Sequence, residues 1–327
     1  MCGKHDLKLP ILGMGCWAYG GGEYWGAQSQ KDVNEVVRYA VEQGCNFFDT
    51  AEAYNEGASE TSLGLALQGI PREQVIIGTK ISPSNSEPNR LKEHCNASLK
   101  RLRTDYVDLY MVHWPITRRA IQHFTREDIA IPNVQEVFDT LMELKAAGKI
   151  RFIGVSNFGP QKLEEALATG AEVIVNELPY SLLTRAIELQ ILPKCRALGI
   201  GVLGYMSLLQ GLLADIYPTL DHVPAWQRRT RHFDSRRTAH TRHGLPGAEA
   251  ETNDALASIR TILVPLAANP VKQTVCRLLG RPALHSCAKS GGHRACDRFA
   301  RGFPHKPELF SDIFAGGGKI MAKSTRV

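Results

Sequence analysis

The sequence predicts an α/β fold, a TIM-type (β/α)8 barrel, and three observations carry that prediction. Strand and helix patterns alternate along the first two-thirds of the 327 residues. Some expected strands, such as VIIGTKI at 75–81, are apolar on both faces, which is typical of a parallel sheet covered by helices. No G-x-G-x-x-G follows the first strand, which counts against an open dinucleotide-binding sheet. Seven strands in about 205 residues favour a barrel, which needs an eighth.

The elements follow one another in a regular order. Strands are expected at 11–17, 45–49, 75–81, 106–113, 150–155, 173–176 and 201–205. The first helix begins after Ser29, has Asp32 as a capping-box partner and ends at Gly44. Further helices are expected at 60–67, 91–103, 134–147, from Pro160 onward, at 186–198, at 253–263 and at 271–279. Residues 285–306 contain no Val, Ile or Leu, so the pattern does not supply the eighth strand and the final helix.

Composition limits the class of protein. Apolar residues make up 43% of the chain and charged residues 22%, as in soluble globular proteins. No run approaches the roughly 20 apolar residues that span a bilayer, and residues 1–10 lack a signal-peptide core. We therefore expect a cytoplasmic protein that does not bind membranes. Its cysteines stay reduced there, and four within apolar or helical patterns are expected as small buried hydrophobes: Cys16, Cys45, Cys95 and Cys195.

The positive charge is concentrated near the C-terminus. Residues 264–327 contain eleven Lys or Arg against three Asp or Glu, a net of +8, which leaves −2 for residues 1–263 of a chain whose total is +6. We therefore expect a barrel over residues 1–263 and a divergent basic segment over 264–327. The segment has no recognisable nucleic-acid-binding module or interleaved aromatic residues, so no nucleic-acid partner is expected.

Three explanations of this C-terminal segment stay open. The segment is either the product of a shifted reading frame, a genuine divergent tail or a metal-binding module. We favour the shifted reading frame, because the periodicity of the sequence ends abruptly. The metal hypothesis uses His285, Cys287, His293 and Cys296, whose spacings match no zinc pattern well, so no metal site is predicted. The other reading frames of the encoding DNA distinguish the first explanation, because one of them should restore a strand and a helix.

Four polar residues stand at or just after consecutive strand ends, where barrels place catalytic groups. They are Asp49 and Tyr54 in FFDTAEAY, Lys80 in IIGTKIS and His113 in DLYMVHWP. Each has an alternative interpretation: Asp49 as a turn residue, Tyr54 as loop packing, Lys80 as a solvated strand cap and His113 as a hydrogen-bonded core residue. Because neighbouring strands lie about 4.8 Å apart, the four side chains can converge on one point.

Over residues 9–262 the chain resembles the aldo-keto reductase superfamily. The matching stretches are LPILGMGCW, NFFDTAEAYNEGASE, VIIGTK, DYVDLYMVHWP, IRFIGVSNF and GIGVLGYMSLLQGLL. The resemblance maps the catalytic tetrad of the family onto Asp49, Tyr54, Lys80 and His113. It implies that the chain reduces aldehydes or ketones to alcohols, with hydride from NAD(P)H and a proton from Tyr54. Lys80 would lower the pKa of Tyr54, Asp49 would hold Lys80, and His113 would orient the carbonyl.

The resemblance also implies a nicotinamide site. Ser156 and Asn157 match residues that bind the carboxamide, and Tyr205 matches the aromatic residue that stacks on the ring, although packing in the barrel is the alternative for it. Glu177 stands where the family usually has Gln, and an ionised carboxylate only accepts hydrogen bonds. Ser207, Leu208 and Gly211 match the loop near the pyrophosphate. NADP(H) is expected ahead of NAD(H).

An apolar wall is expected around the substrate, a small-molecule carbonyl compound. Trp17, Trp25 and Trp114, with Tyr24, lie in segments that should face one mouth of the barrel. Beyond them, six arginines between 228 and 242 form either a solvated loop or a contact with cofactor phosphates. Two other functions stay open: a non-catalytic nucleotide-binding regulatory subunit, or a reductase inactivated by a defective C-terminus. The pattern gives no oligomeric state.

Overall fold

The computed structural model describes residues 5–22, 25–214, 217, 219–223 and 252–259. The chain divides into two compact units, Met1–Ala283 and Leu284–Val327, and the second lies wholly outside the described residues. Several predictions also fall outside them: Tyr24, the arginines from 228 to 242, the helix at 271–279, the four zinc-ligand candidates and the basic segment 264–327.

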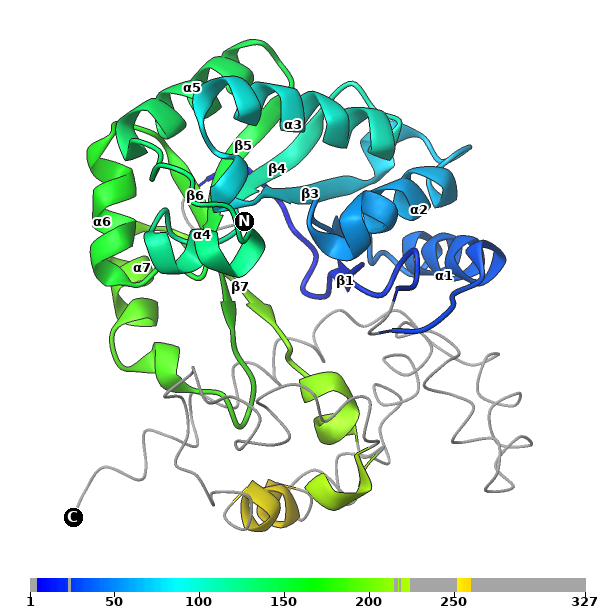
Figure 1. The fold of residues 1–327 in the computed structure, drawn as a ribbon. Coiled ribbons are helices and arrows are strands. Elements are labelled where there is room, and N and C mark those ends of the chain that lie inside the picture. The colour runs from blue at the N-terminus through cyan, green and yellow to red at the C-terminus, as the bar shows by residue number, and fades with distance from the viewer. Residues whose placement is uncertain (1–4, 23–24, 215–216, 218, 224–251, 260–327) are drawn as a thin grey trace, which may run out of the picture. The chain divides into compact units, whose positions relative to one another are not determined.

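Seven parallel strands form one sheet in which each strand pairs with the next along the chain, in the order β1 to β7 (Figure 1). The strands are β1 Met14–Gly15, β2 Phe47–Asp49, β3 Ile76–Ile81, β4 Val107–Val112, β5 Ile150–Ser156, β6 Val173–Pro179 and β7 Gly201–Tyr205. Every one of them overlaps a predicted strand. The α/β class and the barrel of parallel strands are therefore confirmed.

Helices connect the strands and lie around the outside of the sheet, except for α4 (Figure 1). They are α1 Gln30–Glu42, α2 Ala58–Ala66, α3 Pro88–Leu102, α4 Arg118–Phe124, α5 Val134–Ala146, α6 Pro160–Ala168 and α7 Ile191–Leu198. Residues 252–259 are also helical and overlap the helix predicted at 253–263. The sequence did not predict α4, which packs against the turn Pro83–Asn85 after β3. This contact places α4 over the carboxyl ends of the central strands.

Two local predictions were wrong. Ser29 is the N-cap residue of α1, but its side chain makes no capping hydrogen bond, so the expected capping box with Asp32 does not form. The helix predicted at 186–198 is interrupted, because a single 3-10 turn, Ala186–Glu188, precedes α7. Gln190 between them has φ −136°, which is not helical.

The central strands β3, β4 and β6 bury both faces, as their apolar sequences predicted, whereas β7 is half-buried. One face packs against the helices in the larger hydrophobic cluster. The other face forms a smaller cluster with Leu7, built from alternate strand positions such as Phe47, Leu109 and Met111. Because side chains alternate along a strand, Asp49 lies on the same face as Phe47, one step nearer the carboxyl end. The face of the sheet that carries Phe47 and Asp49 is thus apolar along the strands and polar at their carboxyl ends.

The described cysteines behave as predicted. Each of them is 6% exposed or less, and none of them forms a disulfide. They are Cys16, Cys45, Cys95 and Cys195. Among the described residues, no helix is long and apolar enough to cross a membrane. Within the same residues, no group of three or more His, Cys, Asp or Glu side chains is arranged to hold a metal ion.

Candidate active site

The centre of the site is the ammonium of Lys80 on β3, whose side chain is 0% exposed. Its Nζ donates to both carboxylate oxygens of Asp49 on β2, at 2.8 and 2.7 Å, and to the carbonyl oxygen of Thr50 at 3.0 Å. The strand register explains this meeting, because Asp49 lies opposite Gly78, two residues before Lys80 on the same face. Complete burial excludes the alternative of a solvated strand cap for Lys80.

Tyr54 reaches the same ammonium from the loop after β2. Its hydroxyl lies 3.4 Å from Lys80 Nζ, and the ammonium lies 5.0 Å from the centre of its ring. Burial raises the pKa of Tyr54 above its usual range, and the carboxylates of Asp49 and Glu177 raise it further, against the lowering effect of Lys80. The structure therefore places a half-buried phenol in contact with a fixed positive charge.

Glu177 on β6 is the second carboxyl group at this ammonium. Its Oε2 lies 3.3 Å from Lys80 Nζ but makes no hydrogen bond, and its side chain is 5% exposed. Burial and the charge of Asp49 raise the pKa of Glu177 to about 8, and Lys80 only partly offsets them. The pKa of Lys80 itself is raised, because the two carboxyl groups outweigh the effect of burial.

His113 follows β4 directly and faces the phenol. Its ring centre lies 5.5 Å from that of Tyr54, edge to face, and 5.4 Å from that of Phe124 on α4. Burial and the nearby charge of Lys80 hold the pKa of His113 well below its usual range. The imidazole is therefore neutral at physiological pH, and its buried Nδ1 has no hydrogen-bond partner within the described structure.

The residues expected around the nicotinamide also meet. Asn157, directly after β5, has φ +64° and donates from Nδ2 to Ser156 Oγ at 3.0 Å and to the carbonyl oxygen of His113 at 3.1 Å. Its Oδ1 accepts from the hydroxyl of Tyr205 on β7 at 2.8 Å. Ser156 Oγ donates to the main-chain carbonyl of Glu177 at 3.2 Å. These contacts join the ends of β4, β5, β6 and β7.

The loop after β7 contains the three residues matched to the pyrophosphate site. Ser207 is exposed and donates to the carbonyl oxygen of Gly204 at 3.2 Å, and Leu208 is half-buried. Gly211 is buried and has φ +102°, a backbone conformation that favours glycine. This loop begins directly after Tyr205, the last residue of β7.

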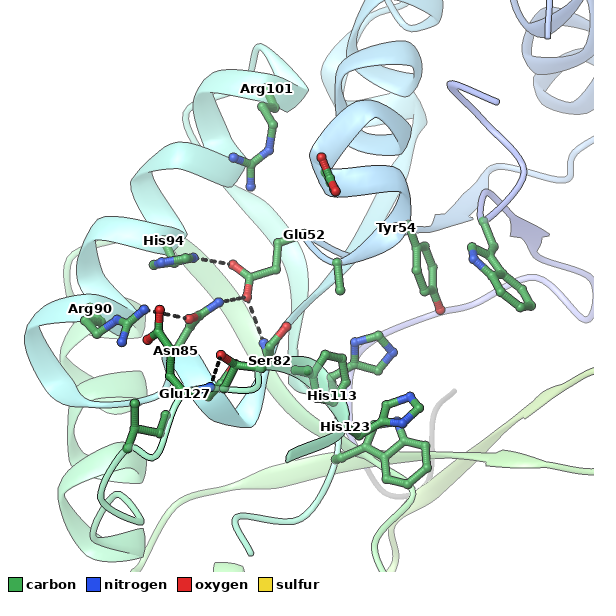
Figure 2. A pocket seen from close by; sticks show the side chains of 18 residues that line it. Glu52, Tyr54, Ser82, Asn85, Arg90, His94, Arg101, His113, His123 and Glu127 are labelled. Atoms are coloured by element: carbon green, nitrogen blue, oxygen red, sulfur yellow. Dashed lines mark hydrogen bonds and ion pairs between the residues drawn. The ribbon is translucent and has the colours of Figure 1, made fainter. Parts of the chain in front are cut away.

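A cavity of about 710 Å³ opens beside these groups, and Tyr54, His113, Trp17 and Trp114 line it (Figure 2). The Trp17 ring lies 6.1 Å from that of Tyr54. Trp25 packs edge-on against Trp17, with ring centres 5.2 Å apart. Of the three tryptophans expected around the substrate, Trp17 and Trp114 therefore line the cavity, and Trp25 packs behind Trp17.

The opposite side of the cavity is polar, and sequence reasoning missed it. Glu52 is buried there and accepts hydrogen bonds from the main-chain N–H of Ser82 at 2.9 Å, from Asn85 Nδ2 at 2.8 Å and from the ring of His94 at 2.7 Å (Figure 2). These hydrogen bonds lower the pKa of Glu52, although burial opposes them. The only signal in the sequence was the place of Glu52 inside the matched stretch FFDTAEAY, because His94 is 42 residues away.

Helix α4 adds two further residues that were not predicted, His123 and Phe124. The ring of His123 stacks on Trp114 with centres 5.1 Å apart, and Phe124 contacts both Trp114 and His113. Both residues line the cavity. Thr117 starts α4 by accepting a hydrogen bond from the N–H of Ala120, a capping signal that could have located the helix.

Comparison with known proteins gives a consistent result. The family model described as "Aldo/keto reductase family" matches residues 11–279. The NADH-specific methylglyoxal reductase of Escherichia coli strain K12 is 36% identical over 248 residues, which cover 70% of this chain and 72% of that protein.

Two solved structures resemble the chain as well. An aldo-keto reductase from Klebsiella pneumoniae in complex with NADPH is 31% identical with a TM-score of 0.52, over 62% of this chain and 65% of that one. A thermostable aldo-keto reductase in complex with the inhibitor epalrestat is 27% identical with a TM-score of 0.58, over 78% of this chain and 98% of that one. The family match spans most of the chain and ends beyond residue 262, where the resemblance expected from the sequence ended. The chain therefore belongs to the aldo-keto reductase family of enzymes.

Proposed function

We propose that this reductase converts small aldehydes or ketones to alcohols, with hydride from a nicotinamide cofactor and a proton from Tyr54. The observation that carries the proposal is the buried ammonium of Lys80, which contacts Asp49 at 2.7 Å and the hydroxyl of Tyr54 at 3.4 Å. A phenol with a pKa of about 10 is a poor acid at neutral pH. A fixed positive charge beside it stabilises the phenolate that remains after proton transfer.

Reduction of the carbonyl needs a hydride on its carbon and a proton on its oxygen, and the cofactor and Tyr54 would supply them. A bound nicotinamide supplies the hydride, which no protein side chain can donate. The hydroxyl of Tyr54 gives its proton to the carbonyl oxygen, and its O–H bonding electrons remain on the phenolate. His113, which is neutral, orients the carbonyl by a hydrogen bond from its ring. Solvent then returns a proton to Tyr54, while Lys80 keeps its charge throughout.

The residues around the strand ends fit a nicotinamide. Ser156, Asn157 and Glu177 would hold its carboxamide, and Tyr205 would cover one face of the ring. The buried Oε2 of Glu177 supports this assignment, because it has no hydrogen-bond partner in the described structure and can accept from an amide NH2. The loop with Ser207, Leu208 and Gly211 would lie near the pyrophosphate.

NADP(H) is proposed ahead of NAD(H), as the sequence led us to expect. The NADPH complex of the Klebsiella relative supports it. The Escherichia coli relative is named as NADH-specific, so both cofactors belong in the test.

The substrate proposed is a small carbonyl compound, and methylglyoxal is the first to try because the Escherichia coli relative is named a methylglyoxal reductase. Trp17 and Trp114 line the cavity beside Tyr54, and Trp25 packs behind Trp17, so the reacting end of the substrate would meet an apolar wall.

The experiment measures cofactor binding and turnover separately. NADPH and NADH are titrated by fluorescence into the purified full chain, and reduction of methylglyoxal is then followed for the wild type and for Tyr54→Phe. We expect binding by both proteins and a loss of kcat of about 10²- to 10⁴-fold in Tyr54→Phe, the usual contribution of a general acid. Full activity of Tyr54→Phe would refute the role of Tyr54. Cofactor binding without any turnover by the wild type would favour the regulatory subunit instead.

A further inference from the structure

We propose that Glu177 is a second carboxyl group on the catalytic lysine and that, once ionised, it holds Tyr54 in its phenol form and so extends carbonyl reduction to higher pH. This inference rests on the proposed function, because it concerns the proton that Tyr54 gives up. It assigns Glu177 a positioning role that goes beyond contact with the cofactor.

The first observation is the geometry of the ammonium. Lys80 has three protons, and its hydrogen bonds go to Asp49, to the carbonyl of Thr50 and to the hydroxyl of Tyr54. Glu177 Oε2 lies at 3.3 Å but makes no hydrogen bond. Glu177 is thus close enough to act by its charge, while Asp49 holds the lysine by direct bonds.

The second observation is the balance of buried charge. Lys80 is 0% exposed and Glu177 5% exposed, and this single cation faces two carboxyl groups. Two carboxylates beside one buried ammonium leave an uncompensated negative charge, which favours a proton on one of them. Asp49 makes two short bonds to the ammonium, so the proton belongs to Glu177. In agreement with this assignment, burial and the charge of Asp49 raise the pKa of Glu177 to about 8.

The third observation is the set of groups that face Glu177. Asp49 comes from β2, Lys80 from β3 and Tyr54 from the loop after β2, and His113 beyond β4 is neutral. Below about pH 8 Glu177 is a neutral acid, and the site contains one cation and one anion. Above that pH its charge opposes a phenolate, so the pKa of Tyr54 is raised by Asp49 and Glu177 together. An ionised Glu177 therefore keeps the pKa of Tyr54 higher than glutamine would at the same position, in addition to the effect of burial.

The substitution Glu177→Gln tests this directly, because it removes the charge and keeps the shape. Tyrosine labelled with ¹³C at the ζ carbon reports ionisation by NMR without turnover, and Tyr54→Phe assigns the signal. We expect the titration midpoint of Tyr54 to fall by about one pH unit in Glu177→Gln, as for the loss of a nearby charge. The alkaline limit of methylglyoxal reduction, at saturating cofactor, should move down by the same amount.

Glu60→Gln is the matched control. Glu60 is also a buried glutamate, but its carboxylate is engaged by Thr79 and Arg101, and it is not among the groups that shift the pKa of Tyr54. Its titration curve for Tyr54 should therefore match the wild type. If Glu177→Gln does not fold, Glu177→Met provides a second neutral side chain of similar length. A glutamate carboxyl signal that titrates near pH 8 in the wild type gives an independent check.

An unchanged Tyr54 midpoint in the neutral variants would overturn the inference, whatever their activity. A change only in the KM for the cofactor, with the pH limit unmoved, would also overturn it, because that is the result of a carboxamide contact alone. Failure of the proposed function looks different: Tyr54→Phe would keep its activity, while the shift of the NMR midpoint in Glu177→Gln would still be seen.

Discussion

Replacing Lys80 by methionine should destabilise the protein strongly and in a pH-dependent way. The substitution replaces the lysine by an apolar side chain that is one atom shorter, and it leaves the half-buried Asp49 and the buried Glu177 without their cation. At the observed 2.7 Å and an effective dielectric constant of about 20, the Lys80–Asp49 attraction is on the order of 6 kcal/mol before desolvation. Because removing one partner of a buried pair typically costs about 3–5 kcal/mol, we expect a loss of that size in the free energy of unfolding at pH 8.

The pH dependence has a definite sign. Without Lys80, burial raises the pKa values of both carboxyl groups in the folded protein above their unfolded values of about 4. The folded state then binds more protons than the unfolded state, so stability falls as the pH rises above about 4. Relative to the wild type, Lys80→Met should therefore be least stable at pH 8 and should recover part of the loss by pH 5.

Urea unfolding followed by tryptophan fluorescence at pH 5 and pH 8 measures both effects. The double variant Lys80→Met with Asp49→Asn is the control, because it removes the lysine together with the carboxylate that the lysine held by two hydrogen bonds. We expect it to regain most of the stability lost by the single variant at pH 8, since neutral replacements of buried pairs are often tolerated. The reasoning would be refuted if the double variant were no more stable than Lys80→Met, or if the loss were the same at both pH values.

Two further predictions concern histidines of the site. The pH–rate profile of reduction should show no inflection near the ordinary histidine value of about 6.5, because burial and the nearby ammonium hold the pKa of His113 well below its usual range; an inflection there would contradict this. His94→Ala should lower the free energy of unfolding by about 1–3 kcal/mol at pH 7, because it removes a donor to a buried carboxylate. The lowered pKa of Glu52 gives stability that is present above its unfolded pKa of about 4.3 and is lost as the pH falls through the folded value, so urea unfolding should show a smaller difference at pH 3.5.

The positions of the main elements could be predicted from sequence because local periodicity determines them. Strand β3 is apolar on both faces and β7 matches its expected bounds, 201–205, at both ends. Helix α4 could not be found in the same way, because its seven residues, RRAIQHF, are too few and too polar to show a helical stripe. The capping box at Ser29 failed because residue types at the right spacing do not ensure the side-chain bond.

Some residues of the candidate site could likewise be predicted from the sequence, and others could not. Asp49, Lys80 and His113 could be predicted together because parallel strands in sequence order bring their carboxyl ends side by side. The pairing of Glu52 with His94 could not, because it joins a loop after β2 to a helix after β3 across 42 residues with no local pattern. Contacts made by strand ends follow from topology, whereas contacts between connecting segments depend on how each loop folds.

Protonation states are the property that is hardest to predict from the sequence, and Glu177 shows why. From residue types alone, an ionised Glu177 only accepts hydrogen bonds, which departs from the glutamine that the family usually has at this position. The structure changes that interpretation, because Glu177 shares one buried ammonium with Asp49, and Asp49 already holds that ammonium by two hydrogen bonds. Because burial and the charge of Asp49 raise its pKa to about 8, this carboxyl group keeps its proton well above the usual pH and, when protonated, offers a donor and an acceptor, as glutamine does. The substitution therefore preserves the hydrogen-bonding capacity of the site at neutral pH and adds a charge only when the solution becomes alkaline.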